Sequence, residues 1–116
     1  MKPEEIFAIH PKIRWAGWAT RRGQVQFAQM REGLESYTPD ANDRATLEIR
    51  AQYLIETVEQ ECVWGGTLDH ITIAFEKYVE IVIPLKTSYM AITVEKDLEP
   101  EAYSTVCRAI RALDKS

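Results

Sequence analysis

The stretch DHITIAFEKYVEIVIPLKTSYMAITV, residues 69–94, decides the fold of this chain. β-Branched and aromatic residues alternate with polar ones along it, and short breaks divide it into three runs. This pattern predicts strands over 69–75, 78–85 and 89–94, because such side chains fit a pleated, half-buried surface. Loops this short join antiparallel strands, so we expect a three-stranded meander.

The alternation also predicts how these strands pair. A three-residue loop after the first strand would pair Phe75, Ile73 and Ile71 with Val79, Ile81 and Ile83, on one apolar face. A four-residue loop over 86–89 would pair Leu85 with Met90, Ile83 with Ile92 and Ile81 with Val94. Pro84 cannot donate a ladder hydrogen bond, so we expect its strand to be irregular there.

Two further strands precede the meander. Residues 13–20 and 24–30 are strand-like runs on either side of Arg21-Arg22-Gly23. A three-residue loop with Gly23 in the left-handed conformation would pair Thr20 with Gln24 and place Gly17 opposite Phe27. Both faces of this hairpin carry apolar residues, which predicts that both are covered.

Three segments have helical patterns. Prolines followed by acids predict a short helix over 3–9 and a terminal helix that starts at 98–101. The strongest start signal, Thr38-Pro39-Asp40, predicts a helix from about Pro39 to Cys62, ended by Trp64-Gly65-Gly66-Thr67. The apolar stripe of the long helix is Leu47, Ala51, Leu54, Ile55, Val58 and Cys62, and that of the terminal helix is Tyr103, Val106, Ile110 and Leu113.

These elements define a fold class. Their order is α-β-β-α-β-β-β-α, which predicts an α/β (α+β) protein with a five-stranded antiparallel sheet and flanking helices. The 116 residues are the size of one domain, so we expect residues 1–116 to form a single domain.

Composition and charge narrow the function. The net charge of −4 makes the molecule as a whole repel nucleic acid. The longest stretch without a charged residue, Thr87 to Val94, is too short to cross a membrane. The opening residues Met1 to Glu5 lack the apolar region of a signal peptide, so we expect a cytoplasmic protein.

The sequence carries no catalytic or metal-binding motif. The two histidines, His10 and His70, are not spaced like the ligands of a known metal-binding motif. We therefore expect no catalytic residue, no metal site, no cofactor and no enzyme activity. Cys62 and Cys107 fall on the apolar stripes of different helices, which predicts two buried, free thiols. Alternation in a covered strand places Trp15 and Trp18 in the core. The pattern does not decide whether Trp64, beside two glycines, is buried or exposed.

The outer face of the long helix is the first candidate site. Ile49 and Tyr53 lie about 160° from Ala51, one turn apart, with Thr46 and Gln60 flanking them. Single exposed apolar residues are ordinary. A compact pair on a helix, however, suits a symmetric contact, so we predict a homodimer through Thr46, Ile49, Tyr53 and Gln60.

The hairpin tip is the second candidate. Arg21 and Arg22 could meet an anionic partner, but the sequence has no block of five or more like charges, which favours a solvated tip with ordinary arginines. We expect both side chains to be in water.

The chain also resembles a known family. The order of elements is similar to that of roadblock domains, which belong to the profilin-like group of small α/β sheets. The segments Ile13 to Gly17, Arg31 to Leu34, Ile83 to Leu85 and Glu95 to Asp97 resemble pieces of a family of small, uncharacterised archaeal proteins with this order. The roadblock resemblance implies homodimers that serve as regulatory platforms for small GTPases or other signalling partners.

Two functions from different classes follow. The first is a non-enzymatic, dimeric regulatory domain of the roadblock type that binds another protein. The alternative is a small-molecule sensor, because related sheets can enclose a ligand between sheet and helix.

Overall fold

The structure is a computed structural model that describes residues 1–37 and 39–115, without the side chains of Asp40, Ala41 and Ile55. The predicted order of elements and the five-stranded antiparallel sheet are confirmed. The elements are α1 (Pro3–Phe7), β1 (Ile13–Thr20), β2 (Val25–Met30), α2 (Asp40–Glu56), the 3-10 turn η1 (Val58–Glu61), α3 (Cys62–Gly65), β3 (Ile71–Ala74), β4 (Tyr78–Pro84), β5 (Ser88–Glu95) and α4 (Glu101–Leu113).

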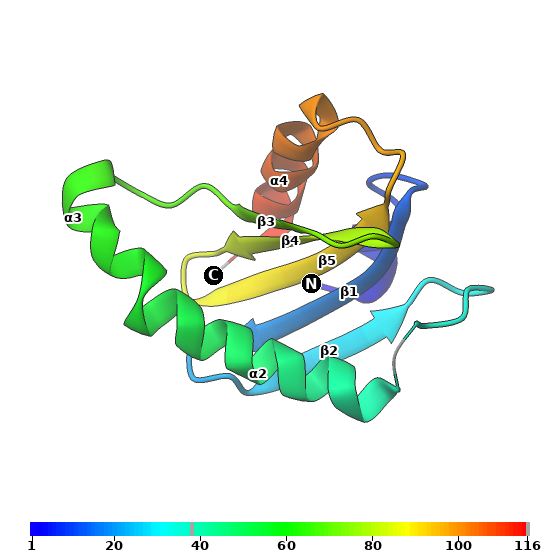
Figure 1. The fold of residues 1–116 in the computed structure, drawn as a ribbon, viewed down its shortest axis with the longest axis horizontal. Coiled ribbons are helices and arrows are strands. Elements are labelled where there is room, and N and C mark those ends of the chain that lie inside the picture. The colour runs from blue at the N-terminus through cyan, green and yellow to red at the C-terminus, as the bar shows by residue number, and fades with distance from the viewer. Residues whose placement is uncertain (38, 116) are drawn as a thin grey trace.

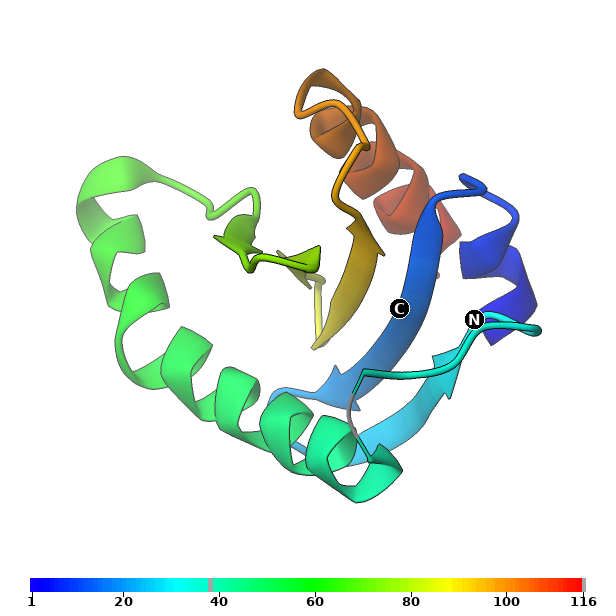
Figure 2. The same ribbon diagram turned by 45° about the vertical axis from the view of Figure 1, so that its right-hand side comes forward.

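The sheet has the strand order β2-β1-β5-β4-β3, so β2 and β3 are its edges. Helix α2 crosses one face of the sheet, while α1 and α4 lie on the other (Figure 1; Figure 2). We refer to these as the α2 face and the α4 face. The chain between α2 and β3, with η1 and α3, projects beyond the sheet (Figure 1).

Each face of the sheet has its own apolar core. On the α2 face, Leu47, Ala51 and Leu54 of the helix pack on side chains of β1, β4 and β5. On the α4 face, Val106, Cys107 and Ile110 pack with Ile6 on the opposite sides of the same strands. Strands β4 and β5 are buried on both faces, which is why they read as nearly continuous apolar runs.

The stripe of α4 and the core placement of Trp15 and Trp18 are confirmed. Val106 and Ile110 are buried, with Tyr103 and Leu113 packed against them. Trp15 is buried, and the half-buried Trp18 donates its indole N–H to Ser88 Oγ at 2.7 Å.

The β1–β2 hairpin has the predicted loop but a different register. Gly23 has a φ of +86°, and the Thr20 amide donates to the Gln24 carbonyl at 2.9 Å, as predicted. Ala19 also faces Val25, in the same register, but the register then shifts by one residue, so that Trp18 faces Phe27. The shift leaves Gln26 as the extra residue of a β-bulge. The prediction that Gly17 faces Phe27 was wrong, and Gly17 faces Ala28 instead.

The predicted pairing of β3 with β4 was also wrong. The loop has two residues, since the Phe75 amide donates to the Tyr78 carbonyl at 2.9 Å. Ile71 therefore faces Val82 and Ile73 faces Glu80, on the α2 face rather than with Ile81 and Ile83. Alternation selects a register only where one face of a strand is buried, and helices lie on both faces of this sheet.

The loop between β4 and β5 is two residues shorter than predicted. The Leu85 amide donates to the Ser88 carbonyl at 2.9 Å, and Ile83 faces Met90 instead of Ile92. A shift of two residues preserves the faces, so the predicted apolar face survives. Strand β4 is regular up to Pro84. The pairing of β4 with β3 reaches only as far as Val82, so the N–H that Pro84 lacks would have had no partner in β3.

The long helix is shorter than predicted. α2 ends at Glu56, and Thr57 (φ −126°, ψ −65°) separates it from η1 and α3. The Thr57 side chain donates to the Tyr53 carbonyl, a local bond that competes with helix continuation. Val58 and Cys62 are consequently only half-buried, which corrects the predicted burial of Cys62. The predicted N-cap Thr38 and the side chain of Ile55 lie outside the described residues.

Candidate functional site

The outer face of α2 carries two large apolar side chains in solvent. Ile49 is 58% exposed and Tyr53 is 53% exposed, whereas Leu47, Ala51 and Leu54 on the opposite side are at most 1% exposed. Thr46 is exposed on the same face. Three of the four residues predicted for an interface thus lie together on one helix.

The fourth residue, Gln60, is not on that helix. It lies in η1, beyond the break at Thr57, and its side-chain amide donates to the Glu56 carbonyl at 2.7 Å. Gln60 is exposed. The prediction that Gln60 lies on the outer face of the long helix was counted along an unbroken helix, and the break at Thr57 makes that count invalid.

An ion pair fixes α2 to the sheet. Arg50 Nε lies 2.8 Å from Glu80 Oε2, and the Glu80 side chain is only 9% exposed. The hydrogen bond to Glu80 raises the pKa of the Arg50 guanidinium, so the pair stays charged. Arg50 follows Ile49 in the helix, and the bond therefore also sets how the outer face is presented.

A groove continues the outer face of α2 toward the sheet edge. Its volume is about 310 Å³, and Arg50, Tyr53, Leu54, Ile71, Ile73 and Val82 line it. Ile71 and Ile73 were not predicted as surface residues, because the predicted β3–β4 register placed them on the opposite face. Only the two-residue loop after Phe75 reveals their position.

β3 is also an edge strand, paired with β4 alone. A row of its backbone N–H and C=O groups therefore points away from the sheet, next to this groove. Such an edge can pair with a strand of another chain.

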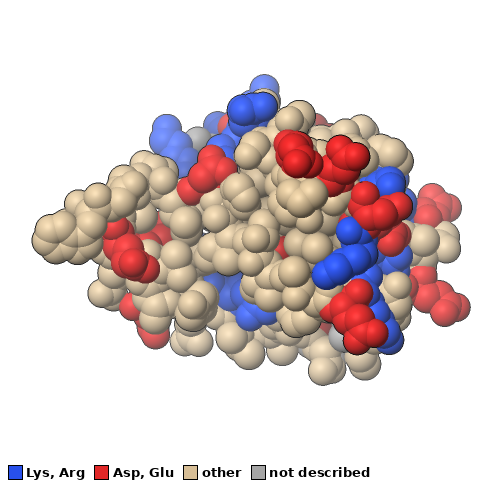
Figure 3. Space-filling view, turned by 45° about the horizontal axis from the view of Figure 1, so that its top comes forward, with Lys and Arg blue, Asp and Glu red and all other residues tan. Residues whose placement is uncertain are grey.

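A second apolar projection lies at the end of α3. Val63 is 80% exposed and Trp64 is 88% exposed. The space-filling view shows this projection ending in uncharged atoms (Figure 3). The sequence pattern did not decide whether Trp64 is buried or exposed, and nothing in it marked Val63 as an exposed residue.

The hairpin tip differs from the solvated loop that we expected. Arg21 forms an ion pair with Glu59 and donates to the Leu85 carbonyl at 2.6 Å. Its side chain is 28% exposed. Arg22 beside it is exposed. Arg21 therefore links the β1–β2 loop to η1, and of the two arginines Arg22 is the exposed one.

The sensor hypothesis predicts a pocket between sheet and helix. A cavity of about 150 Å³ lies there, with Arg14, Trp15, Tyr37, Arg50 and Tyr78 in its lining. Ligand pockets usually measure ~300–1,000 Å³. The cavity suits only a very small ligand, so the surface of α2 is the stronger candidate site.

No helix within the described residues is both long and apolar enough to pass through a bilayer.

The strand order, the crossing helix α2 and the helices on the opposite face define the class: this is a roadblock-type domain fold of the profilin-like group. The roadblock resemblance read from the sequence is confirmed at the level of the fold.

Three solved structures illustrate the similarity. An MglB structure with a tetrameric arrangement matches with a TM-score of 0.73 and 15% identity, over 95% of this chain and 80% of that chain. The roadblock/LC7 domain from Streptomyces avermitilis matches with a TM-score of 0.66 and 9% identity, over 94% and 91%. A profilin from Schizosaccharomyces pombe matches with a TM-score of 0.58 and 14% identity, over 88% and 84%. No protein-family model matches the sequence, and no curated protein matches it.

Proposed function

We propose that this protein is a non-enzymatic, homodimeric regulatory domain of the roadblock type, in which the outer faces of two α2 helices pack across a two-fold axis. One observation carries the proposal. Ile49 and Tyr53 are more than half exposed on a helix whose other side is sealed against the sheet. A two-fold axis near Ala51 would pair Ile49 with the second copy's Tyr53, and the reverse, so one contact buries four large side chains.

The surroundings of the pair support this arrangement. The groove lined by Ile71 and Ile73 adjoins Tyr53 and adds apolar surface to the same side of the molecule. The free edge of β3 runs beside it. The MglB structure similar in fold has a tetrameric arrangement, which is a property of that protein and a precedent for association of this fold.

An antiparallel two-fold also gives the α3 projection a place to bind. In an antiparallel pair, the C-terminal end of one α2, from which η1 and α3 continue, lies beside the N-terminal end of the other α2, which Tyr37 precedes in the chain. Tyr37, which is 51% exposed and stacked on Tyr78 with 5.7 Å between ring centroids, is the aromatic side chain at that end. We therefore include Trp64 and Tyr37 in the proposed interface.

Sedimentation velocity tests the proposal. The wild type is expected to sediment with twice the 13.3 kDa chain mass at micromolar concentration. The double variant Ile49→Glu/Tyr53→Glu should be a folded monomer, because each copy would bring two carboxylates into an apolar contact. The helix should still form, since both positions are exposed.

The matched control adds the same charge elsewhere. Gln26→Glu/Gln29→Glu places two carboxylates on exposed positions of β2, the other sheet edge, and should remain dimeric. A monomeric wild type would refute the dimer. A double α2 variant that stays dimeric with an unchanged melting temperature would exclude this helix face.

The class of partner is the finer part of the proposal. The roadblock resemblance points to a small GTPase or another signalling protein, with Arg22, beside Arg21, as the contact for an anionic patch. Small GTPases of the source organism, loaded with GDP or a GTP analogue, can be titrated against the labelled dimer. We expect one of them to bind in a nucleotide-dependent manner and Arg22→Glu to weaken it. If none of the GTPases binds while the protein remains a dimer, a GTPase partner is excluded and the proposal of a homodimer is unaffected.

A further inference from the structure

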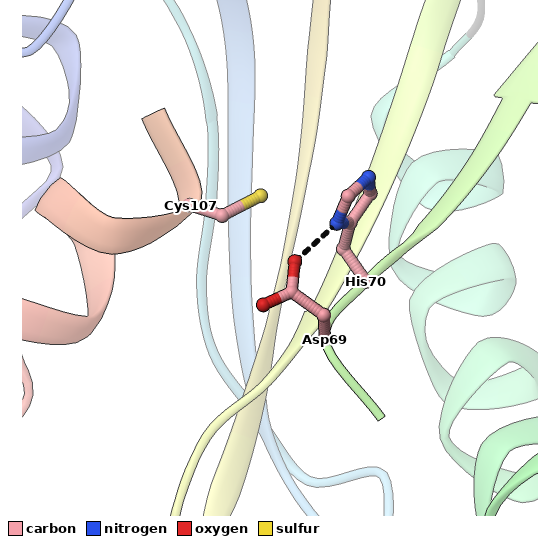
Figure 4. Close-up of side chains that lie close together, drawn as sticks. All are labelled: Asp69, His70 and Cys107. Carbon is pink, nitrogen blue, oxygen red and sulfur yellow. Dashed lines mark hydrogen bonds and ion pairs between the residues drawn. The ribbon is translucent and has the colours of Figure 1, made fainter. Parts of the chain in front are cut away.

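Three metal-binding side chains come together between the start of β3 and the middle of α4. Asp69 and His70 precede β3, and Cys107 is in α4 (Figure 4). One donor atom of each lies within 4.8 Å of the other two. This cluster could not be predicted from the sequence, because Cys107 is distant from the other two along the chain and the spacing matches no linear motif.

The three side chains point into one shared space. The Cys107 sulfur projects from α4 toward the Asp69 carboxylate, and the His70 ring approaches that carboxylate from the β3 side (Figure 4). His70 Nδ1 lies 2.5 Å from Asp69 Oδ2. The exposed fraction rises across the cluster, from 0% for Cys107 to 23% for the His70 side chain and 64% for that of Asp69. The cluster therefore has a buried soft donor and a side that opens to water.

We infer that Asp69, His70 and Cys107 form a binding site for Zn²⁺, with water as the fourth ligand, which links the start of β3 to α4. Thiolate, imidazole and carboxylate are the donors that Zn²⁺ takes in proteins, and three protein ligands plus water make a tetrahedral site. Zinc–ligand bonds of ~2.0–2.3 Å place the donors about 3.3–3.6 Å apart. The three donor atoms lie within 4.8 Å of one another, and His70 Nδ1 and Asp69 Oδ2 at 2.5 Å, so an ion between them would separate the imidazole and the carboxylate.

Arg111 supplies an outer contact that orients the carboxylate. Its Nη1 lies 3.2 Å from Asp69 Oδ1, and its Nη2 donates to the Asp69 backbone carbonyl. Oδ1 is thus engaged, while Oδ2 faces His70. Ligating carboxylates in metal sites usually have such a partner. The thiolate and the carboxylate neutralise the dication, so Arg111 keeps its contact with Asp69 in the loaded site.

Access is provided from the surface. A groove of about 850 Å³ opens beside the cluster, and both Asp69 and Arg111 line it. An ion can therefore reach Asp69 from solvent and pass inward to His70 and Cys107.

The surroundings of the three side chains shift the pKa values of two of them. Burial raises the pKa of Cys107 to about 11, with the charge of Asp69 as a further cause. The hydrogen bond with His70 lowers the pKa of Asp69, which is therefore ionised at neutral pH.

Metal titration of the chelator-treated chain tests the site. Zn²⁺, competed against a chromophoric chelator, should bind with one ion per chain. Co²⁺ should give the visible bands of a tetrahedral site and a thiolate charge-transfer band. Cys107→Ser should remove the charge-transfer band, and His70→Ala should weaken Zn²⁺ binding by at least about 100-fold. Because His70 is partly exposed, we expect His70→Ala to fold, and it therefore tests the site even if Cys107→Ser is unfolded.

The chain offers a matched control for each ligand. Cys62→Ser and His10→Asn change the other cysteine and the other histidine, and both should bind Zn²⁺ like the wild type. Absence of stoichiometric binding, a Co²⁺ spectrum without a thiolate band, or unchanged binding in His70→Ala would each overturn the inference. In that case the cluster is a hydrogen-bonded contact of Asp69 with His70 and Arg111.

Discussion

Gly17 shows at the residue scale why the α2 face is closely packed. A Cβ atom at this position would lie 2.9 Å from Leu47 Cδ2 and even closer to the Trp15 ring. Both neighbours are buried, so neither can move away freely. The absence of a side chain at Gly17 therefore lets α2 approach β1.

Gly17→Ala is accordingly expected to destabilise the protein by about 1–3 kcal/mol, which is the usual cost of overpacking a core. Urea unfolding followed by circular dichroism measures this. The control is Gly65→Ala, where no atom lies within 4 Å of the added Cβ and φ is not in the left-handed region. Equal midpoints for Gly17→Ala and the wild type would show that α2 is not packed as described.

The two cysteines should differ in reactivity. Cys107 is 0% exposed and its thiol pKa is about 11, whereas Cys62 is half-buried in the short helix α3. A thiol reagent at pH 8 should modify Cys62 at least about 10-fold faster, because the thiolate is the reactive form and needs access. Cys62→Ser isolates the slow phase. A single fast phase for both thiols would contradict the burial of Cys107.

Burial of this thiol also predicts a pH dependence. The folded pKa of Cys107, about 11, is above the ordinary value of 9.0, so burial favours the protonated form. Its contribution to stability is complete below pH 9 and is lost as pH rises through 11. Unfolding midpoints measured over this range should fall more steeply for the wild type than for Cys107→Ala. Parallel curves would exclude the contribution.

At the scale of elements, α3 is the segment whose packing the dimer would change most. Trp64 is 88% exposed in one chain. Contact with Tyr37 of a second copy would shift its fluorescence to shorter wavelength as the protein concentration crosses the dimer dissociation constant. Subtracting the spectrum of Trp64→Phe removes the contributions of Trp15 and Trp18, which are covered within one chain.

The variants separate the two parts of this interpretation. Tyr37→Ser should reduce the shift while the chain remains a dimer. A dimer in which Trp64 fluorescence does not change with concentration would remove α3 from the interface and keep α2 in it.

The elements themselves could be predicted from the sequence, because each has a local signal. The prolines and acids at the starts of α1 and α4 and the β-branched runs of β4 and β5 act within one segment. Pairing depends on more than one segment. The predicted β3–β4 register was wrong because helices lie on both faces of the sheet, so that apolar residues such as Ile71 and Ile73 can be accommodated on either face.

The break in the long helix and the cluster around Cys107 could not be predicted for a similar reason. The apolar stripe continues past Thr57 to Val58 and Cys62, but α2 ends at Glu56 because the backbone of Thr57 leaves the helical region. Asp69, His70 and Cys107 meet because β3 and α4 lie on neighbouring parts of the fold. The exposed pair Ile49 and Tyr53, by contrast, follows from the helical period alone, and the structure places it where that period predicts.

At the scale of the whole molecule, the sheet is covered unequally. The α4 face is closed by α1 and α4. On the α2 side, the outer helix face, the groove beside β3 and the end of α3 expose apolar side chains along one continuous flank. Large exposed apolar patches in a folded protein usually mark an interaction surface. The proposed homodimer would cover this flank and leave the hairpin tip with Arg22 accessible to another protein.

Distances between spin labels across the dimer test this arrangement most directly. In a Cys62→Ser background, with Cys107 buried, a nitroxide label is attached at Gln52→Cys on α2 or at Gln26→Cys on β2, both at exposed positions. Pulsed electron paramagnetic resonance then measures the separation of the two copies. The proposed two-fold predicts a short, well-defined distance for position 52 and a much longer one for position 26. A shorter distance at position 26, or no dipolar coupling at position 52 under conditions where the protein is dimeric, would contradict a dimer formed through α2.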